Sequence, residues 1–331
     1  MLVSACALSA LVALASCTPA TIPPGEMLPI AVESSVIDDL GGNPTLAPGL
    51  TFLGGIELSS PEPLFGAFSS IRFRDDKSFL GVFDTGYWIE GRILRDAGGR
   101  LSGVEAVRIA PLLDASGRES RSKFQVDAES LALDSDRGFV GFEQRHRVLA
   151  YAPLPDLGKA LPSAPLAFPF DLDILHSNGG FESLVIAPKG SPVEGALVAI
   201  SEKSFDENGN LYAAIVGGPL TGEFRVRPRD DFEITDATFL PDGDLLLLER
   251  RFSIATGVGM RLRRIEGASL RPDAVVDGEI LFEANYRSQI DNMEGLDAMP
   301  EADGSVRLIV VSDDNHSILQ RSLMLEFRLE K

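Results

Sequence analysis

Cysteine, histidine and tryptophan are scarce in this sequence. Of its 331 residues only two are cysteines, Cys6 and Cys17, so no disulfide framework is available to the rest of the chain. The three histidines have no zinc-ligand spacing, which argues against hydrolysis by a transition metal. With a single tryptophan, an aromatic sugar-binding groove is not expected either.

Basic side chains are also fewer than acidic ones. The chain has 30 basic and 49 acidic side chains, a net charge of −19. A nucleic-acid partner is therefore not expected, because phosphate backbones require a basic surface. No Gly-x-Ser-x-Gly motif is present, so a carboxylesterase would need some other serine within hydrogen-bond reach of a histidine. The negative charge instead suits a protein that holds cations or stays soluble.

The first 16 residues are apolar, contain no Lys or Arg, and lead into Leu14-Ala-Ser-Cys17. This segment resembles a bacterial lipoprotein signal with its lipobox. The resemblance implies cleavage before Cys17, a lipid on that thiol, and a periplasm-facing location in the cell envelope. A chance cysteine in an ordinary signal peptide, giving a secreted protein, is the alternative. Residues 17–48 are rich in proline and predict an extended tether, and residues 49–331 form the domain.

A hairpin unit recurs five times in that domain. Each unit has a first strand that opens on an acid, or on a serine in the earliest copy, then a turn and a second strand. The first strands begin at Ser70, Glu129, Glu182, Asp236 and Glu294. Steps of 53 to 59 residues leave room for about four short strands per repeat. The sequence therefore predicts an all-β fold, a β-propeller with five four-stranded blades favoured and six left open.

The two ends of the domain are expected to pair with each other. Residues 50–58 and 323–329 both read as strands. Their pairing within the last blade would close the ring and leave no open sheet edge.

Acids open the first strands and close the second strands of the hairpins. Because hairpin strands run antiparallel, these ends lie at the same edge of the sheet, and the acids are expected to meet at one mouth of the central channel. The expected metal ligands are Glu129, Glu182, Asp236, Glu249, Glu294, Asp313 and Asp314, with Glu143 and Glu202 beside them. So many carboxylates cannot all stay ionised without counter-charge, and Ca²⁺ accepts several carboxylate oxygens at once.

Basic side chains follow several of these acids. The expected substrate-binding residues are Arg145, Lys203, Arg250 and Arg251, which would neutralise phosphate oxygens. The expected catalytic residues are Glu182, Glu294 and His316, which would activate water or transfer a proton. A structural interpretation is also open, in which the same acids form salt bridges with these bases or cap backbone amides.

Four segments resemble the phytase-like family, known as "esterase-like activity of phytase". They are Gly180-Phe-Glu-Ser-Leu184, Leu246-Leu-Leu-Glu-Arg-Arg-Phe252, Asn292-Met-Glu-Gly-Leu296 and Val311-Ser-Asp-Asp-Asn315. The family is similar in architecture to β-propeller phytases, which are calcium-dependent phosphomonoesterases. The resemblance covers residues 50–330 and implies a phosphoric-ester hydrolase. It carries over as candidate site positions Glu182, Glu249, Arg250, Glu294, Asp313 and Asp314. Ser70 and Ser183 depart from the family's pattern.

The leading hypothesis is a membrane-tethered monomer that hydrolyses a small phosphoester with Ca²⁺ at the acidic mouth. The alternative is a non-catalytic propeller of the cell envelope that binds a ligand or protein partner and uses Ca²⁺ only structurally.

Overall fold

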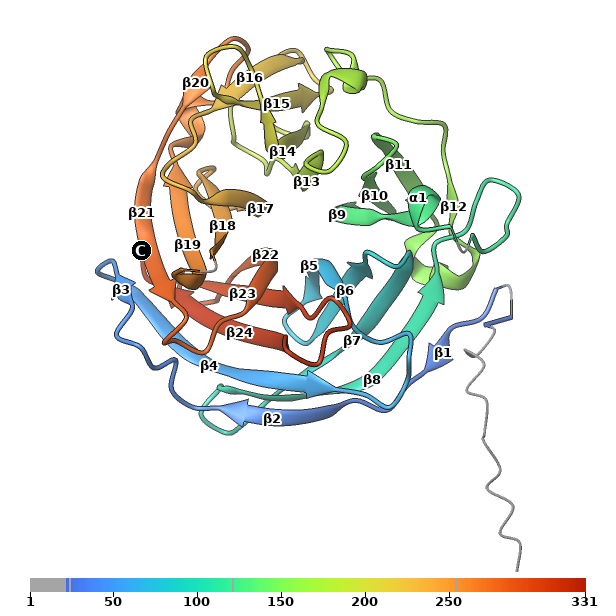
Figure 1. The fold of residues 1–331 in the computed structure, drawn as a ribbon, viewed down its shortest axis with the longest axis vertical. Helices are drawn as coiled ribbons and strands as arrows, with labels where there is room; N and C mark the ends of the chain where they lie inside the picture. The colour runs from blue at the N-terminus through green and yellow to red at the C-terminus, as the bar shows by residue number, and fades with distance from the viewer. Residues whose placement is uncertain (1–21, 24, 121, 254) are drawn as a thin grey trace, which may run out of the picture.

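Five mainly antiparallel sheets surround a central channel (Figure 1). The fold is seen in a computed structural model, which describes residues 22–331 except 24, 121 and 254. The predicted signal segment and Cys17 lie outside the described residues. The arrangement confirms the prediction of a five-bladed β-propeller.

The strands of each blade follow one another from the channel outwards. Blade 1 is β5 (Phe68–Asp75), β6 (Ser78–Phe83), β7 (Tyr87–Arg95), β8 (Leu101–Pro111) and β1 (Leu28–Pro29). Blade 2 is β9 (Ala128–Asp134), β10 (Arg137–Phe142), β11 (Arg147–Ala152) and β12 (Leu161–Pro162). Blade 3 is β13 (Phe181–Ile186), β14 (Leu197–Phe205), β15 (Leu211–Val216), β16 (Gly222–Val226) and β20 (Val275–Val276). Blade 4 is β17 (Glu233–Phe239), β18 (Leu245–Ser253), β19 (Gly257–Ile265), β21 (Glu279–Asn285) and β3 (Thr45–Leu46). Blade 5 is β22 (Asn292–Pro300), β23 (Val306–Asp313), β24 (Ser322–Leu329), β4 (Leu50–Ser59) and β2 (Glu33–Ile37).

The first and last long strands pair within blade 5, as the sequence predicts. Strands β4 and β24 run antiparallel, from Leu50 opposite Leu329 to Leu58 opposite Ser322. Because this pairing joins the two ends of the domain inside one sheet, the ring is closed by hydrogen bonds.

The described part of the predicted tether differs from the expected extended segment. Strand β2 pairs with β4, β1 with β8, and β3 with β21, so this segment adds an outer strand to three blades. Backbone groups on an exposed sheet edge bind extended chain readily, and the short strands β1 to β3 carry no periodic hydrophobic signal. The segment therefore runs along the outside of the ring (Figure 1).

Alternating burial explains how the blades pack. In β18, Leu246 and Leu248 face blade 5, whereas Leu245 and Leu247 face blade 3, and all four are fully buried. A strand buried on both faces reads as a continuous apolar run, which is what residues 245–248 show. Each such side chain contributes roughly 1.5–3 kcal/mol through burial.

The inner strands approach closely enough that one position requires glycine. A Cβ at Gly295 would lie 2.7 Å from Val311 Cγ2 and 3.0 Å from the Ile71 amide nitrogen. Blade 5 therefore meets blade 1 backbone to backbone at the channel.

In the described part of the chain, helices are few and short. They are α1 (Lys123–Val126) and the 3₁₀ turns η1 (Leu154–Lys159), η2 (Leu172–Ile174) and η3 (Gly267–Ser269). Among the described residues, none of the helices has the length and apolar character needed to cross a membrane.

Candidate functional site

Every inner strand has a β-bulge within its first few residues. In the pairing of each inner strand with its neighbour, one residue of the inner strand is left without an opposite partner. These five equivalent residues are Ser69, Glu129, Glu182, Thr235 and Glu294. A bulge re-aims the side chain at its position, and here it places three carboxylates at the same mouth of the channel.

The second strands supply the other half of the mouth. On each second strand, one residue lies opposite the inner-strand residue that precedes the bulge, and the residue after it is equivalent from blade to blade. These five residues are Asp84, Glu143, Glu202, Arg250 and Asp313. Blade 4 therefore contributes a cation where the other four blades contribute an acid.

Together these positions line a polar hollow of about 220 Å³, hereafter the mouth. Its eight carboxylates are Asp84, Asp127, Glu129, Glu143, Glu182, Glu202, Glu294 and Asp313. Its three cationic side chains are Lys123, Lys203 and Arg250. Six of the eight acids were expected at the mouth from the sequence, and acids outnumber cations by more than two to one.

One trio of carboxylates lies between blades 1 and 2. Asp84, Asp127 and Glu129 each offer an oxygen, and these oxygens all lie within 4.8 Å of one another. Lys123 of α1 contacts this trio, with Nζ 2.6 Å from Asp84 Oδ2 and 3.5 Å from Asp127 Oδ1. The Oδ1 atoms of Asp84 and Asp127 are buried and accept no hydrogen bond from the described residues.

A second trio lies between blades 2 and 3. Glu143, Glu182 and Glu202 also bring carboxylate oxygens within 4.8 Å of one another, and all three side chains are buried. Lys203 pairs with Glu202 at 2.8 Å. Gly180 donates its amide hydrogen to Glu143 Oε1 at 3.4 Å.

Arg250 connects residues of two neighbouring blades at the mouth. Its Nη2 donates to Glu202 Oε1 at 2.8 Å and its Nη1 to Asn292 Oδ1 at 2.7 Å. Its Nε lies 3.3 Å from Glu294 Oε1, which also accepts a hydrogen bond of 2.8 Å from Asn292 Nδ2. One guanidinium thus links blades 3, 4 and 5.

Burial and crowding raise the pKa values of the acids. Desolvation is the largest cause, and it raises the pKa of Glu294 to about 8 and those of Glu143 and Asp313 to about 7. Neighbouring carboxylates add to the effect. For Glu129 and Glu182, desolvation followed by the charge of nearby acids raises the pKa well above the usual value. A bound cation would stabilise the ionised forms and so oppose these shifts.

Asp236 lies deeper in the channel than the sequence suggests. The bulge residue of blade 4 is Thr235, and a shift of one residue turns a side chain to the other face of a strand. Asp236 is fully buried and forms an ion pair with Arg72 instead of facing the mouth.

Glu249 and Asp314 are likewise held inside the fold and do not line the mouth. Glu249 is fully buried and pairs with Arg263, because Arg250 takes the mouth position of its strand. Asp314 accepts hydrogen bonds from the Ala67 amide at 3.0 Å and from Ser322 Oγ at 2.8 Å. Both acids therefore stabilise the fold.

Three predicted side chains lie outside the mouth. His316 is exposed on the loop after β23, and Arg145 is exposed at the edge of a different pocket. Arg251 points away from Arg250, with its guanidinium carbon 4.8 Å from the centre of the Phe232 ring. The catalytic role expected for His316 and the phosphate role expected for the two arginines have no support from this placement.

Sequence reasoning missed Asp84, Asp127 and Lys123 as site residues. Asp84 closes the second strand of the hairpin that begins near Ser70, so the blade lacking a first-strand acid supplies its carboxylate from the second strand. Asp127 precedes Glu129 by two residues, and Lys123 reaches the mouth from α1.

Similarity to solved structures extends over most of the chain but is low in identity. A protein of unknown function from Dyadobacter fermentans has 11% identity and a TM-score of 0.41, covering 93% of this chain and 100% of that one. A putative oxidoreductase (glucose dehydrogenase) from Thermus thermophilus has 15% identity and a TM-score of 0.34, covering 89% and 99%. Similarities at this level carry no argument about activity. No curated protein matches the sequence.

A family profile described as "Phytase-like: Esterase-like activity of phytase" matches residues 63–316. The matched range contains all five bulges and every residue of the mouth. Because the match spans well over half of the sequence and agrees with the motifs described above, the chain belongs to the phytase-like family.

Proposed function

We propose that the protein is a Ca²⁺-dependent phosphoric-ester hydrolase whose reaction takes place at the mouth. The observation that carries this proposal is the pair of carboxylate trios in one hollow, each with oxygens within 4.8 Å of one another. Ca²⁺ takes six to eight oxygen ligands and tolerates irregular geometry, which suits clusters of this kind.

The donor sets fit such an ion. Asp84, Asp127 and Glu129 would hold one ion and Glu143, Glu182 and Glu202 a second. The Oδ1 atom of Asp84 is buried without a hydrogen-bond donor among the described residues, which is unfavourable unless a cation or water satisfies it, whereas the Oδ1 atom of Asp127 lies 3.5 Å from Lys123 Nζ. Ca²⁺ bound there would neutralise the acids and polarise a phosphoryl oxygen and a water molecule.

The cationic side chains would bind the phosphate group. Lys123 and Lys203 each flank one trio, and Arg250 contacts Glu202 of the second trio as well as Glu294. A phosphomonoester placed between them would have its oxygens neutralised from several directions, and Arg250 offers the fork geometry that suits phosphate.

Glu294 is the proposed general base. It belongs to neither trio, lies beside Arg250, and has a pKa raised to about 8 by burial. Metal binding nearby would lower this pKa toward neutrality, where a carboxylate can take a proton from an attacking water. Glu182, expected from the sequence to be catalytic, is assigned to metal binding instead.

The test is phosphate release from 4-nitrophenyl phosphate and from phytate, with calcium and with EGTA. The proposal predicts activity that is lost with EGTA and restored by calcium. It also predicts that Glu294→Gln lowers kcat by on the order of a hundredfold or more without lowering calcium affinity. Turnover that is unaffected by chelation would remove the metal from the mechanism. Calcium binding without turnover of any phosphoester would favour the non-catalytic propeller with structural calcium.

For location, we propose that Cys17 carries a lipid and that the domain faces the periplasm. The proposal rests on the sequence Leu14-Ala-Ser-Cys17 alone. Metabolic labelling with a fatty-acid analogue tests it, because Cys17→Ser should abolish the label while leaving the folded domain intact.

A further inference from the structure

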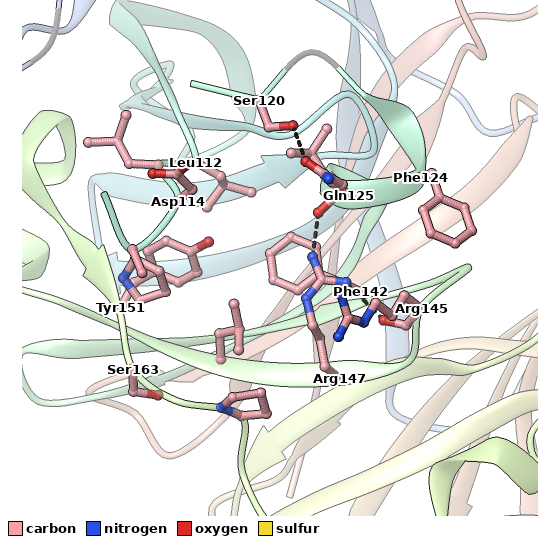
Figure 2. A pocket seen from close by; sticks show the side chains of 16 residues that line it. Leu112, Asp114, Ser120, Phe124, Gln125, Phe142, Arg145, Arg147, Tyr151 and Ser163 are labelled. Atoms are coloured by element: carbon pink, nitrogen blue, oxygen red, sulfur yellow. Dashed lines mark hydrogen bonds between the residues drawn. The ribbon is translucent and has the colours of Figure 1, made fainter. Parts of the chain in front are cut away.

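A second pocket lies beside the mouth, on the far side of α1 (Figure 2). It has a volume of about 320 Å³, within the range of small-ligand sites. Its walls come from the segment after β8, from α1, from strands β10 and β11 with the turn between them, and from residues 162–165.

The lining of this pocket is opposite in character to that of the mouth. Most of it is apolar or aromatic, with Leu112, Phe142, Leu149 and Tyr151 among its residues. Asp114 is the one carboxylate among its described lining residues, against eight at the mouth. An apolar body of aromatic size fits this surface, whereas a metal ion does not.

Two arginines lie at the end of the pocket away from Tyr151 (Figure 2). Arg147 is fixed in place: its Nη1 donates to the Arg145 carbonyl oxygen at 2.8 Å, its Nη2 donates to the Gln125 carbonyl oxygen, and its guanidinium carbon lies 4.2 Å from the centre of the Phe142 ring. Among the ion pairs of the described residues, none involves Arg145 or Arg147, although acids are in large excess in the chain.

The Tyr151 hydroxyl adds an uncharged polar group to the pocket. The residue is 3% exposed, and its ring packs at 5.5 Å in an edge-to-face contact with Trp88. None of the hydrogen bonds among the described residues uses its hydroxyl. The hydroxyl is not one of the fully buried polar atoms that lack a partner, so it is open to the pocket and available to a ligand.

We propose that this pocket binds an amphipathic organic anion of the aryl carboxylate class. Its apolar part packs against Leu112, Leu149 and Tyr151, and its anionic group is held by Arg147 and Arg145. The binding needs no metal ion and does not depend on the hydrolytic function proposed for the mouth. The two sites have no lining residue in common. They adjoin at α1, where Lys123 lines the mouth and Phe124 the pocket, and at the end of β10, where Phe142 lines the pocket and Glu143 the mouth.

Calorimetric titration of the full chain with 2-naphthoate, and with its neutral analogue 2-naphthylmethanol, tests the proposal. The carboxylate should bind in the presence of EGTA, and the alcohol should bind at least tenfold more weakly, because a charge-assisted hydrogen bond is lost. Equal affinity for the two compounds would overturn the role of the arginines. Absence of binding by 2-naphthoate at millimolar concentration would overturn the proposal as a whole.

Variants distinguish this pocket from the mouth. Arg147→Gln should weaken 2-naphthoate binding by on the order of tenfold or more, and Arg145→Gln should do so to a smaller extent. Ala115→Trp fills the pocket from an exposed position and should abolish binding even if Arg147→Gln fails to fold. Arg287→Gln, an exposed arginine elsewhere, serves as the matched control and should bind normally. Binding that requires calcium and is unaffected by Ala115→Trp would place the ligand at the mouth and refute the proposal.

Discussion

Asp236 and Arg72 form a buried ion pair in the middle of the ring. Two nitrogens of Arg72 donate to the two oxygens of Asp236, both at 2.8 Å. Arg72 also donates to the carbonyl oxygens of Leu184 and Leu296, and Asp236 accepts from the Leu296 amide at 2.9 Å. The pair therefore connects the inner strands of blades 1, 3, 4 and 5, and it fixes the geometry beneath the mouth.

Asp236→Asn should destabilise the protein by about 3–5 kcal/mol, because it leaves the Arg72 guanidinium buried without a counter-charge. Urea denaturation measured by circular dichroism checks this value. The double variant Arg72→Met with Asp236→Leu is the control, and it should be less destabilised than the single variant because no charge is left unpaired. If Asp236→Asn changes stability by less than about 1 kcal/mol, the pair does not have the structural role described here.

Calcium should stabilise the protein through the acids of the mouth and not through the other acids predicted from the sequence. Glu182→Gln should lower calcium affinity by tenfold or more and reduce the rise in Tm that saturating calcium produces. Glu249→Gln should lower Tm by removing the buried ion pair with Arg263, which keeps only its pairing with Asp277 among the described residues, yet it should keep the calcium-induced rise. Calorimetric titration well below Tm and thermal melts measure the two effects. An equal loss of calcium affinity in both variants would show that Glu249 was misplaced.

Without calcium, stability should fall as the pH rises from about 5 to 8. In the folded protein the pKa of Glu294 is raised to about 8 and that of Glu143 to about 7, whereas the unfolded chain releases these protons near pH 4.3. Between those values the folded state binds more protons than the unfolded state, so the free energy of unfolding decreases with pH. The decrease is roughly 1.4 kcal/mol per pH unit for each group that keeps its proton.

Urea denaturation in EGTA at pH 5, 6.5 and 8 measures this slope, and Glu294→Gln should make it shallower. Saturating calcium should oppose the decline, because the ion binds the ionised carboxylates and displaces their protons. A calcium-free protein that becomes more stable over this range would contradict the raised pKa values.

The repeat was predictable from the sequence because pairs of hydrophobic strands joined by polar turns recur at a nearly constant spacing. Those features depend on the buried core and on the turns, and they were enough to predict the five blades and the pairing of strands that closes the ring. They do not report on short edge strands. Strands β1 and β3 consist of two residues each, and their pairing depends on unpaired backbone groups of β8 and β21 that no sequence pattern reveals.

The site residues were predictable from the sequence in the blades whose bulge residue is an acid. They were not predictable in blade 4, where the acid lies one residue after the bulge. Glu129, Glu182 and Glu294 are bulge residues followed by a small residue, Ser or Gly. In blade 4 the bulge residue is Thr235, and Asp236 takes the position of the small residue. A one-residue difference in register is invisible to hydrophobic patterning, yet it decides whether a carboxylate faces the mouth or the channel interior.

Arg250 and Arg251 are adjacent in the sequence but point in different directions. Substitutions at these two positions therefore form a matched pair of variants. Arg250 contacts Glu202, Asn292 and Glu294 at the mouth, whereas Arg251 packs on Phe232. Arg250→Gln should lower kcat/KM for 4-nitrophenyl phosphate by roughly 10²-fold, since removing one preorganised donor to a developing charge typically has an effect of this size. Arg250→Lys should recover part of the loss, because it restores the charge without the fork. Arg251→Gln should leave kcat/KM within about twofold of the parent protein. Steady-state kinetics at saturating calcium measure kcat/KM for these variants, and Tm is measured alongside. Equal losses of kcat/KM in the two glutamine variants would argue against phosphate binding by Arg250.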